Sequence, residues 1–472
     1  MPPKVGDILD VTIDTLAYGG QGVARDRDFV VFVRRAVPGD RVRARVTRRK
    51  RSYAEAHVEE LLQPSPRRVP ARCAHEPGCG GCEWQTLAYD AQLDYKQRQV
   101  VESLEHIAGL TAFEVEPIRG MADPWRYRNK MEFSFGDHDG RLTLGLHRRG
   151  SWREVVEIDD CHLAPLEVNG ARRALADACR HLGLPAYSQV SHQRLLRHLV
   201  VRRGAASGEL LLNLFVRERF AKEEQLAALV AARQAFTSFA ITVNSTPSDA
   251  AVGEGPYMVS GPPQFHEDLA GVHLRVPATA FLQTNSEMCS VLYETVLRCA
   301  RPEATRSAYD LYCGIGGLAI LLARQAARVY GMEMVAEATA AALENARLNG
   351  VDNVVFAAGD VRKLLVAPPT GRDEQLAQRL AKDHSWSPPQ APFDPPAVVV
   401  TDPPRAGMSR KAVERLALLG AERIVYVSCN PTTLAGNAVW LAALGYRLMR
   451  IAPVDMFPHT HHIETVSLFE RS

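Results

Sequence analysis

The chain has 472 residues, of which 46% are hydrophobic and 23% are charged, and its formal net charge is +2. This length predicts about two to four domains, and the composition is that of a folded globular protein rather than a disordered or fibrous one. No apolar run approaches the roughly 18 residues of a membrane span, and the first residues lack the apolar segment of a signal peptide. We therefore expect a cytoplasmic, monomeric protein with no membrane partner. Nine cysteines in such a chain favour free thiols or metal ligands over disulfides.

Residues 1–62 are predicted to form a small β-barrel. Four segments alternate apolar and polar residues as strands do, and the turns between them contain Gly19-Gly20 and Pro38-Gly39-Asp40. Regular short strands of this kind are typical of small closed barrels. The four segments are 8–17, 28–36, 40–49 and 53–62.

The same region is basic, with 15 Lys and Arg against 9 Asp and Glu in residues 1–72. The excess is greatest in the run Arg41–Arg51, which holds no acidic residue, whereas a solvated surface strand normally mixes both signs. We interpret the run as a nucleic-acid contact and expect the barrel to supply affinity while leaving the chemical step alone. The candidate contacts are Arg45, Arg48, Arg49 and Lys50.

Three cysteines, Cys73, Cys79 and Cys82, lie in the sequence CAHEPGCGGC, after a proline-containing linker. The glycines between the second and third allow both thiolates to face one centre, and Cys161 in EIDDCHLAP offers a fourth ligand. Four thiolates suit a [4Fe-4S] cluster, in which each iron takes one cysteine, and the paired C-x2-C motifs of zinc ribbons are missing from the sequence. We predict this site in a central α+β domain over residues 63–290. Zinc, with His75 or His162 as a rival ligand, stays as the alternative.

Strand and helix patterns alternate from residue 291 onward. This alternation predicts a doubly wound parallel sheet, so the fold class is α/β, with a Rossmann-like domain over residues 291–472. A polar, proline-rich stretch, 364–396, interrupts the pattern as a loop insertion to which we assign no function. The strand patterns cover 307–312, 327–333, 353–360, 397–404 and 423–429.

The sequence DLYCGIGGLAI follows one of these strands and opens a helix. Its glycines, including Gly314 and Gly317, let the backbone turn tightly beside a ligand. Glu333, Asp360 and Asp402 end three further strands, and the carboxyl ends of parallel strands line the crevice where such sheets bind ligands. Each acid alone is explained equally well as a helix cap, but together they favour a nucleotide site. The pattern resembles S-adenosylmethionine methyltransferases more than dinucleotide dehydrogenases, whose G-x-G-x-x-G turn has a third glycine.

Cys429 stands where the strand 423–429 ends before Asn430-Pro431, on the ligand side of the predicted sheet. It can be interpreted as a packed core thiol, a metal ligand or a nucleophile. Its position alone leaves these three interpretations open.

Taken together, these motifs resemble the RNA uracil-C5 methyltransferase family, whose members make 5-methyluridine in ribosomal and transfer RNA. The correspondence runs nearly end to end and begins with a TRAM-like barrel and the cysteine motif with its distant fourth cysteine. The further motifs are YRNKMEF, FLQTN, DPPRAG, YVSCNP and FPHTHHIET. The last three of these, in this order, are highly specific for the family.

The resemblance implies a role for individual residues. Cys429 would be the nucleophile and Glu464 the general base, and Gly317 stands where relatives often carry asparagine. The basic side chains of YRNKMEF, Arg128 and Lys130, are further candidates for RNA contact. The implied cofactor contacts are Gln283, Tyr312, Glu333, Asp360 and Asp402.

The implied chemistry explains why a cysteine is needed. Carbon 5 of uracil is a poor nucleophile, and a thiolate that adds to carbon 6 turns the base into an enolate that can displace the methyl group. A general base then removes the carbon-5 proton so that the thiol can leave, and a target inside folded RNA must first be flipped out of its stack.

The preferred substrate is 23S ribosomal RNA, with transfer RNA as the runner-up. An RNA cytosine-C5 methyltransferase is an alternative, because it also needs a thiolate. The cytosine enzymes tend to place their cysteines in P-C or T-C motifs, and DPPR has no cysteine after its prolines. A non-catalytic RNA-binding or assembly factor is the alternative from another class.

Overall fold

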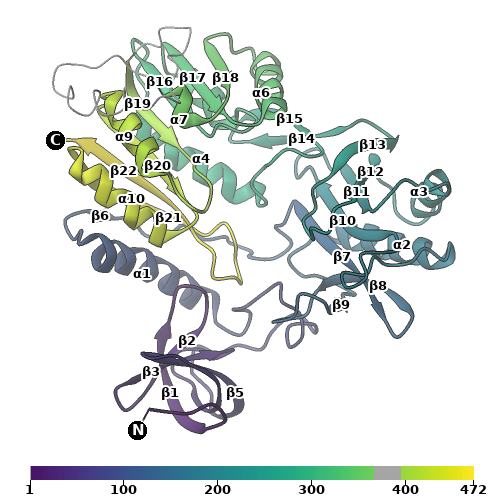
Figure 1. The fold of residues 1–472 in the computed structure, drawn as a ribbon. Coiled ribbons are helices and arrows are strands. Elements are labelled where there is room, and N and C mark those ends of the chain that lie inside the picture. The colour runs from purple at the N-terminus through teal and green to yellow at the C-terminus, as the bar shows by residue number, and fades with distance from the viewer. Residues whose placement is uncertain (1, 366–394) are drawn as a thin grey trace.

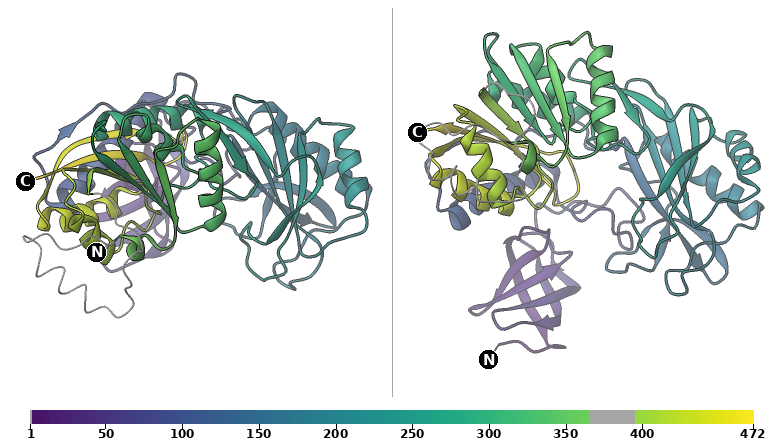
Figure 2. Two further views of the ribbon diagram at one scale, coloured as in Figure 1. Left: turned by 90° about the horizontal axis from the view of Figure 1, so that it is seen from above. Right: turned by 45° about the horizontal axis from the view of Figure 1, so that its top comes forward.

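The computed structural model describes residues 2–365 and 395–472. It contains a closed barrel, a seven-stranded sheet, an eight-stranded sheet and a separate two-stranded hairpin. Figure 1 shows the barrel standing apart from both large sheets, and the right view of Figure 2 shows the same separation. Most of the predicted insertion 364–396 lies outside the described residues.

The N-terminal barrel closes because its strands alternate buried and exposed side chains, so that one face surrounds an apolar core. Strands β3 and β5 run parallel in an otherwise antiparallel order, β1-β2-β3-β5-β4. The sequence predicts every strand except β2, in which only Val23 and Ala24 are apolar. The strands are β1 (Ile8–Leu16), β2 (Gly22–Asp26), β3 (Phe29–Arg34), β4 (Arg41–Arg49) and β5 (Tyr53–Gln63).

The seven-stranded sheet forms the centre of an α+β domain. Its order is β13-β12-β11-β10-β7-β8-β9, and all neighbours are antiparallel except β11 and β12. Helices α2 (Leu166–His181) and α3 (Glu223–Ala231) pack against it. Its strands are β7 (Lys130–His138), β8 (Arg141–His147), β9 (Val155–Glu157), β10 (Leu196–Arg203), β11 (Leu210–Val216), β12 (Ser238–Val243) and β13 (Glu254–Ser260).

The eight-stranded sheet has the order β18-β17-β16-β19-β20-β22-β21-β6. Its strands from β18 to β20 are parallel neighbours, whereas β22 runs antiparallel to both β20 and β21. Successive residues point into different apolar cores, Ala308 toward the core that includes α4 and α5, and Tyr309 toward the core that includes α9 and α10. Burial on both faces explains why these strands appear in the sequence as nearly continuous apolar runs.

The elements of this C-terminal body are as follows in chain order. The strands are β16 (Ser307–Leu311), β17 (Arg328–Glu333), β18 (Val354–Ala358), β19 (Pro396–Thr401), β20 (Arg423–Ser428), β21 (Tyr446–Val454) and β22 (Glu464–Arg471). The helices are α4 (Ser286–Ala300), α5 (Gly317–Ala323), α6 (Ala336–Leu348), α7 (Val361–Leu364), α9 (Arg410–Leu418) and α10 (Pro431–Ala443).

Three segments of the predicted central domain pack with the C-terminal body instead. Helix α1 (Tyr89–Ala108) lies against α10, and β6 (Glu114–Val115) pairs with β21. The hairpin of β14 (Gln264–Leu269) and β15 (Val272–Pro277) lies against α4 and α6. The predicted ranges 63–290 and 291–472 therefore do not follow the packing, because sequence patterns do not show which distant segment completes a sheet. None of the described helices combines the length and apolar character that a membrane crossing needs.

Candidate active site

The predicted nucleophile and base lie opposite each other on neighbouring strands. Cys429 directly follows β20, and Glu464 opens β22. These strands pair antiparallel with Ser428 opposite Thr465, so the next position of the register places Cys429 opposite Glu464. Both side chains stand at the carboxyl edge of the parallel strands, the edge where doubly wound sheets bind ligands.

Cys429 differs from the other cysteines in its exposure. All nine cysteines are free, and Cys429 is the only one whose side chain is not buried. Partial burial raises the pKa of the Cys429 thiol to about 11, and the nearby charges of Glu464 and Asp402 act in the same direction, whereas Arg405 lowers it. Cys429 is therefore a reachable thiol that needs positive charge nearby before it ionises.

Glu464 and Asp402 form a pair of neighbouring acids. Glu464 is 3% exposed, and its Oε2 has no hydrogen-bond partner among the described residues. Burial raises its pKa well above the usual range, and the charge of Asp402 raises it further. Burial also raises the pKa of Asp402 to about 6, although a hydrogen bond from Gln283 lowers it in part. A carboxyl group with a raised pKa is suited to accept a proton near neutral pH.

The glycine-rich turn after β16 approaches the end of β17. Tyr312, Gly314 and Gly316 all have positive φ angles, of 64°, 54° and 89°. The backbone N–H of Gly314 donates to Glu333 Oε2 at 3.1 Å, which fixes the turn against one of the predicted cofactor-binding acids. Nothing lies within 4 Å of the position where a Cβ of Gly314 would stand, so the turn leaves open space for a ligand.

The other predicted contacts occupy this edge in different ways. Asp360 caps α7 by accepting from the N–H of Arg362 at 2.9 Å, the helix-cap role that the sequence left open. A Cβ at Gly317 would stand 2.9 Å from the Tyr293 hydroxyl. Tyr293 therefore takes the space of the side chain that relatives often carry at Gly317.

Asp310 is an acid at this site that the sequence interpretation missed. It lies within β16, is 1% exposed, and has no hydrogen-bond partner for either carboxylate oxygen among the described residues. Burial raises its pKa well above the usual range, and the charges of Asp402 and Glu333 add to the effect, while the nearby backbone N–H of Ala319 offsets only part of it. The signal was present in the sequence, since an aspartate inside an apolar strand calls for an explanation.

These acids fit S-adenosylmethionine, which carries positive charge on its sulfonium and amino groups. Buried carboxyl groups without partners are costly unless a cation or a donor completes them. The unpartnered oxygens of Asp310 and Glu464, beside Asp402 and the open glycine turn, supply that complement.

The loop 455–463, between β21 and β22, positions Glu464 through contacts with several parts of the chain. The N–H groups of Glu83 and Trp84 donate to the carbonyl of His459 at 3.0 and 3.1 Å. The His459 ring stacks on Trp125 with centroids 3.8 Å apart. Lys96 is fully buried and donates to Asp455 at 2.6 Å. The histidines of this loop thus hold it in place and do not gather as metal ligands. Figure 1 shows the loop (yellow) reaching from the C-terminal sheet toward the barrel.

The four predicted cluster cysteines are close enough to affect one another. Each is buried, and the charge of Cys161 raises the pKa of Cys73, Cys79 and Cys82 after the larger effect of burial. The N–H of Gly81 donates to Cys79 Sγ at 3.3 Å. Four buried thiols that affect one another, with a backbone donor beside one of them, are the ligand set of an iron–sulfur cluster. Within the described ranges, no three His, Cys, Asp or Glu side chains converge to hold a single metal ion.

The predicted RNA contacts are less exposed than the sequence suggests. Arg45 pairs with Glu59, and Arg48 with Glu55 at 3.5 Å, because β5 brings acids beside the basic strand β4. Arg49 and Lys50 remain exposed. Arg128 and Lys130 are half-buried, and burial lowers the pKa of Lys130. Two of the four candidate contacts on β4 are therefore partly neutralised within the barrel, whereas Arg49 and Lys50 stay exposed.

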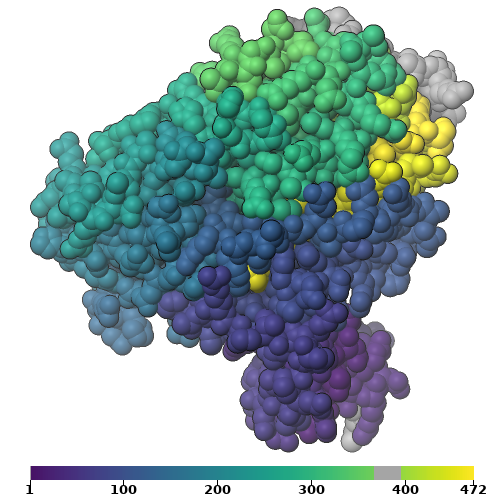
Figure 3. Space-filling view, turned by 180° about the vertical axis from the view of Figure 1, so that it is seen from behind, coloured from purple at the N-terminus to yellow at the C-terminus, as the bar shows by residue number. Residues whose placement is uncertain are grey.

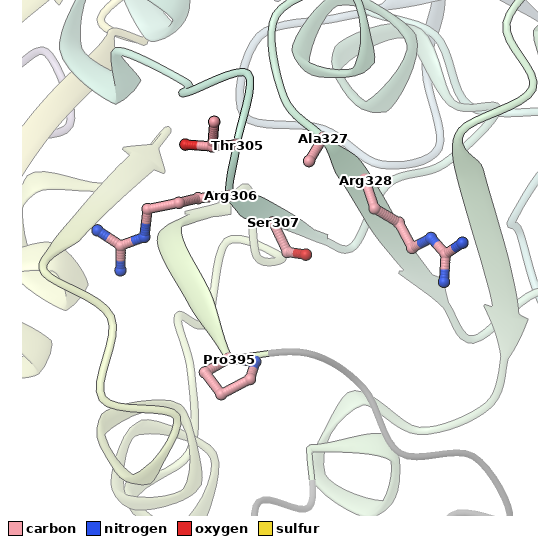
Figure 4. A pocket seen from close by; sticks show the side chains of 6 residues that line it. All are labelled: Thr305, Arg306, Ser307, Ala327, Arg328 and Pro395. Atoms are coloured by element: carbon pink, nitrogen blue, oxygen red, sulfur yellow. The ribbon is translucent and has the colours of Figure 1, made fainter.

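A hollow of about 450 Å³ lies at the opposite edge of the eight-stranded sheet (Figure 4). Its lining residues stand where β16, β17 and β19 begin, so it is separate from the edge that carries Cys429. We assign it no function. It is lined by Thr305, Arg306, Ser307, Ala327, Arg328 and Pro395.

Comparison with known proteins identifies two regions and many relatives. A model of the tRNA (uracil-5-)-methyltransferase family matches residues 268–472, and a TRAM domain model matches residues 2–58. An uncharacterized RNA methyltransferase of Halalkalibacterium halodurans is 36% identical over 471 residues, covering 99% of this chain and 98% of the relative. Another, from Nitratidesulfovibrio vulgaris, is 37% identical over 468 residues, covering 98% of this chain and 96% of the relative.

A solved structure resembles the whole fold. The Pyrococcus abyssi tRNA (uracil-54, C5)-methyltransferase, in complex with S-adenosyl-L-homocysteine, matches 98% of this chain and 100% of its own chain, with a TM-score of 0.75 and 26% identity. The predicted TRAM barrel and Rossmann-like methyltransferase fold are thereby confirmed. The chain belongs to the RNA uracil-C5 methyltransferase family and is an S-adenosylmethionine-dependent RNA methyltransferase.

Proposed function

We propose that this enzyme methylates carbon 5 of a specific uridine in RNA through a covalent bond between Cys429 and the base. The placement of Cys429, the one cysteine that is not buried, opposite Glu464 is the observation that carries the proposal. A cytosine-C5 enzyme needs a thiolate as well, but the family match favours uracil.

The residues divide the reaction between addition and elimination. Bound S-adenosylmethionine supplies an electrophilic methyl group. The Cys429 thiol gives its proton to water, and its sulfur adds to carbon 6, so that the electron pair of the 5,6 double bond forms an enolate. Carbon 5 then takes the methyl group as the sulfonium–methyl bond breaks, which leaves S-adenosylhomocysteine. Glu464 accepts the carbon-5 proton, the double bond re-forms, and the Cys429 sulfur leaves. The charges of Glu464 and Asp402 raise the pKa of Cys429, and a cation beside these acids would offset that effect and lower the pKa.

We favour 23S ribosomal RNA as the substrate, because the sequence combines a TRAM barrel with a predicted iron–sulfur site. Transfer RNA is the second candidate. The similarity to an archaeal enzyme that acts on tRNA uracil-54 supports that second candidate. A cytoplasmic location and a monomeric state stay predictions.

The test of the proposed function is to map 5-methyluridine in both RNAs from cells that lack the gene. One uridine should lose its methyl group and regain it when purified enzyme and S-adenosylmethionine are added. Unchanged 5-methyluridine in every RNA, or the loss of 5-methylcytidine in its place, would contradict the proposal.

We also propose that Cys73, Cys79, Cys82 and Cys161 hold a [4Fe-4S] cluster that organises the protein around it. The chain continues from Cys82 to Glu83 and Trp84, whose N–H groups bind the loop before Glu464. Arg149 donates to the carbonyl of Cys79 at 3.1 Å and to that of Cys82. The proposed methyl transfer has no redox step, so we assign the cluster a structural role.

Anaerobically prepared protein should be brown and contain about four irons per chain, as a four-cysteine cubane requires. Cys161→Ala should lose iron as completely as Cys79→Ala, because each thiolate binds one corner. Cys179→Ala is the matched control, since Cys179 is also a buried thiol but lies in α2, outside the four proposed ligands. Metal analysis checks this; stoichiometric zinc without iron would disprove the cluster.

A further inference from the structure

The loop between β1 and β2 of the barrel is docked firmly onto the rest of the enzyme. Gln99 on α1 donates to the carbonyls of Leu16 and Ala17 at 3.1 and 3.2 Å, and Trp84 Nε1 donates to that of Gly20 at 3.3 Å. A Cβ at Gly20 would stand 3.3 Å from both Glu83 and Trp84 and 3.4 Å from His461, so the backbone approaches closely there. The position of this loop is therefore set by the body that carries the active site.

An apolar cluster supports the same contact. Leu16 and Val37 of the barrel share one buried cluster with Trp84, Leu87 and Ala91, which precede or open α1. Figure 3 shows a small area of C-terminal surface (yellow) enclosed by N-terminal segments (blue and purple) above the barrel. The barrel is thus attached beside the loop 455–463, which precedes Glu464.

Tyr18 extends from this docked loop toward the catalytic groups. Its ring meets His461 edge-on, with centroids 6.3 Å apart, and His461 pairs with Glu83. The phenol oxygen is buried, but the described residues give it no regular hydrogen bond. Burial raises the pKa of Tyr18, a side-chain hydrogen bond from Arg405 and its charge lower it, and the charges of Cys429 and Glu464 raise it. The three groups stand at the ends of β19, β20 and β22, the edge proposed to receive the uridine.

This arrangement departs from our expectation that the barrel leaves the chemical step alone. The expected contacts lie on β4, where acids of β5 neutralise two of the candidates, whereas Tyr18 lies on the loop that faces the active site.

We propose that Tyr18 is a substrate-contacting residue of the methylation site, whose hydroxyl donates a hydrogen bond to an oxygen of the target nucleotide beside Arg405. The inference rests on the proposed function. An arginine can only donate, so Arg405 leaves the O–H of Tyr18 without an acceptor among the described residues, and the missing partner is an acceptor oxygen. Either a uracil carbonyl or the phosphate of the same nucleotide supplies one. At the carbonyl, the bond would strengthen as negative charge develops on the enolate.

The test compares Tyr18→Phe with Tyr53→Phe, the matched change of the other barrel tyrosine, which packs edge-on against Phe32. Single-turnover methylation is measured with labelled S-adenosylmethionine on RNA from cells that lack the gene. Tyr18→Phe should lose about 10- to 100-fold in methylation rate or in RNA affinity, the effect of one lost donor to a charged acceptor. S-adenosylhomocysteine affinity should not change, because the cofactor contacts come from other elements.

The two acceptors predict different losses. With a uracil carbonyl, the methylation rate falls while RNA affinity measured by filter binding changes little. With a phosphate, RNA affinity falls instead, and its salt dependence is unchanged because no cation is lost. Both results support the proposal.

Equal rates and equal RNA affinities for Tyr18→Phe and Tyr53→Phe would overturn the role of Tyr18. The docking bonds of the loop use backbone carbonyls, so Tyr18→Phe should fold, and thermal unfolding of both variants checks this. If the variant melts early, the rates are compared at a temperature where both are folded. A wild-type enzyme that methylates no uridine would refute the proposed function itself, which separates the two failures.

Discussion

Replacing Cys429 with alanine should abolish methyl transfer, by about 10⁴-fold or more, as loss of a covalent nucleophile does in other enzymes. S-adenosylhomocysteine binding should survive, because the proposed cofactor contacts stand on other strand ends. Replacing Glu464 with glutamine should instead permit addition and methylation and then stall, with the RNA still attached through Cys429. The two variants fail on opposite sides of methyl transfer, and gel analysis under denaturing conditions distinguishes them.

RNA that carries 5-fluorouridine at the target site provides the control for this assignment. Fluorine cannot leave as a cation, so wild-type enzyme should form a protein–RNA adduct that resists denaturation. Cys429→Ala should form none, whereas Cys299→Ala, which removes a buried thiol of α4, should react as the wild type does. An adduct or methylated uridine with Cys429→Ala would show that another residue is the nucleophile.

Lys96→Met should weaken the attachment of the 455–463 loop by about 3–5 kcal/mol, the usual cost of leaving one partner of a buried ion pair alone. Lys96 and Asp455 are both 0% exposed, and Lys96 also donates to the carbonyl of Phe457 at 3.0 Å. Tyr89 donates to the other oxygen of Asp455 at 2.9 Å, but a neutral hydroxyl cannot replace the positive charge of Lys96. Hydrogen exchange should become faster in residues 455–463, and methylation should slow because Glu464 follows that loop.

The double variant Lys96→Met with Asp455→Asn serves as the matched comparison. It leaves no isolated charge, so it should recover part of the loss, and the cycle measures the coupling of the pair. If Lys96→Met exchanges as slowly as the wild type, the pair does not hold the loop.

The proposed catalytic pair could be named from the sequence because its signal is local. Cys429 ends an apolar strand before Asn430-Pro431, and Glu464 stands in a specific motif. The doubly wound fold was predictable for the same reason, since its strands and helices each carry their own pattern. The family match confirms both the fold and the family.

Features that depend on distant partners could not be predicted in this way. The acids of β5 that neutralise Arg45 and Arg48 lie on another strand, so the basic run looked free in the sequence. The docking of α1 and β6 on the C-terminal sheet has no local signal either. Tyr18 was missed because a tyrosine beside two glycines looks like an ordinary turn residue until the loop is seen against His461.

The separation of Lys96 from Asp455 along the chain has a consequence for synthesis. The two residues are 359 positions apart, which a ribosome covers in about 20 to 70 s at 5 to 20 residues per second. During that time α1 has emerged without α10 and without the carboxylate that its buried lysine requires. The apolar side chains of α1, such as Val100 and Leu104, must meanwhile stay in contact with water or with a chaperone. The contacts of α1 with the barrel can form early, whereas its packing against α10 and the pairing of Lys96 are completed only after the loop 455–463 has been made.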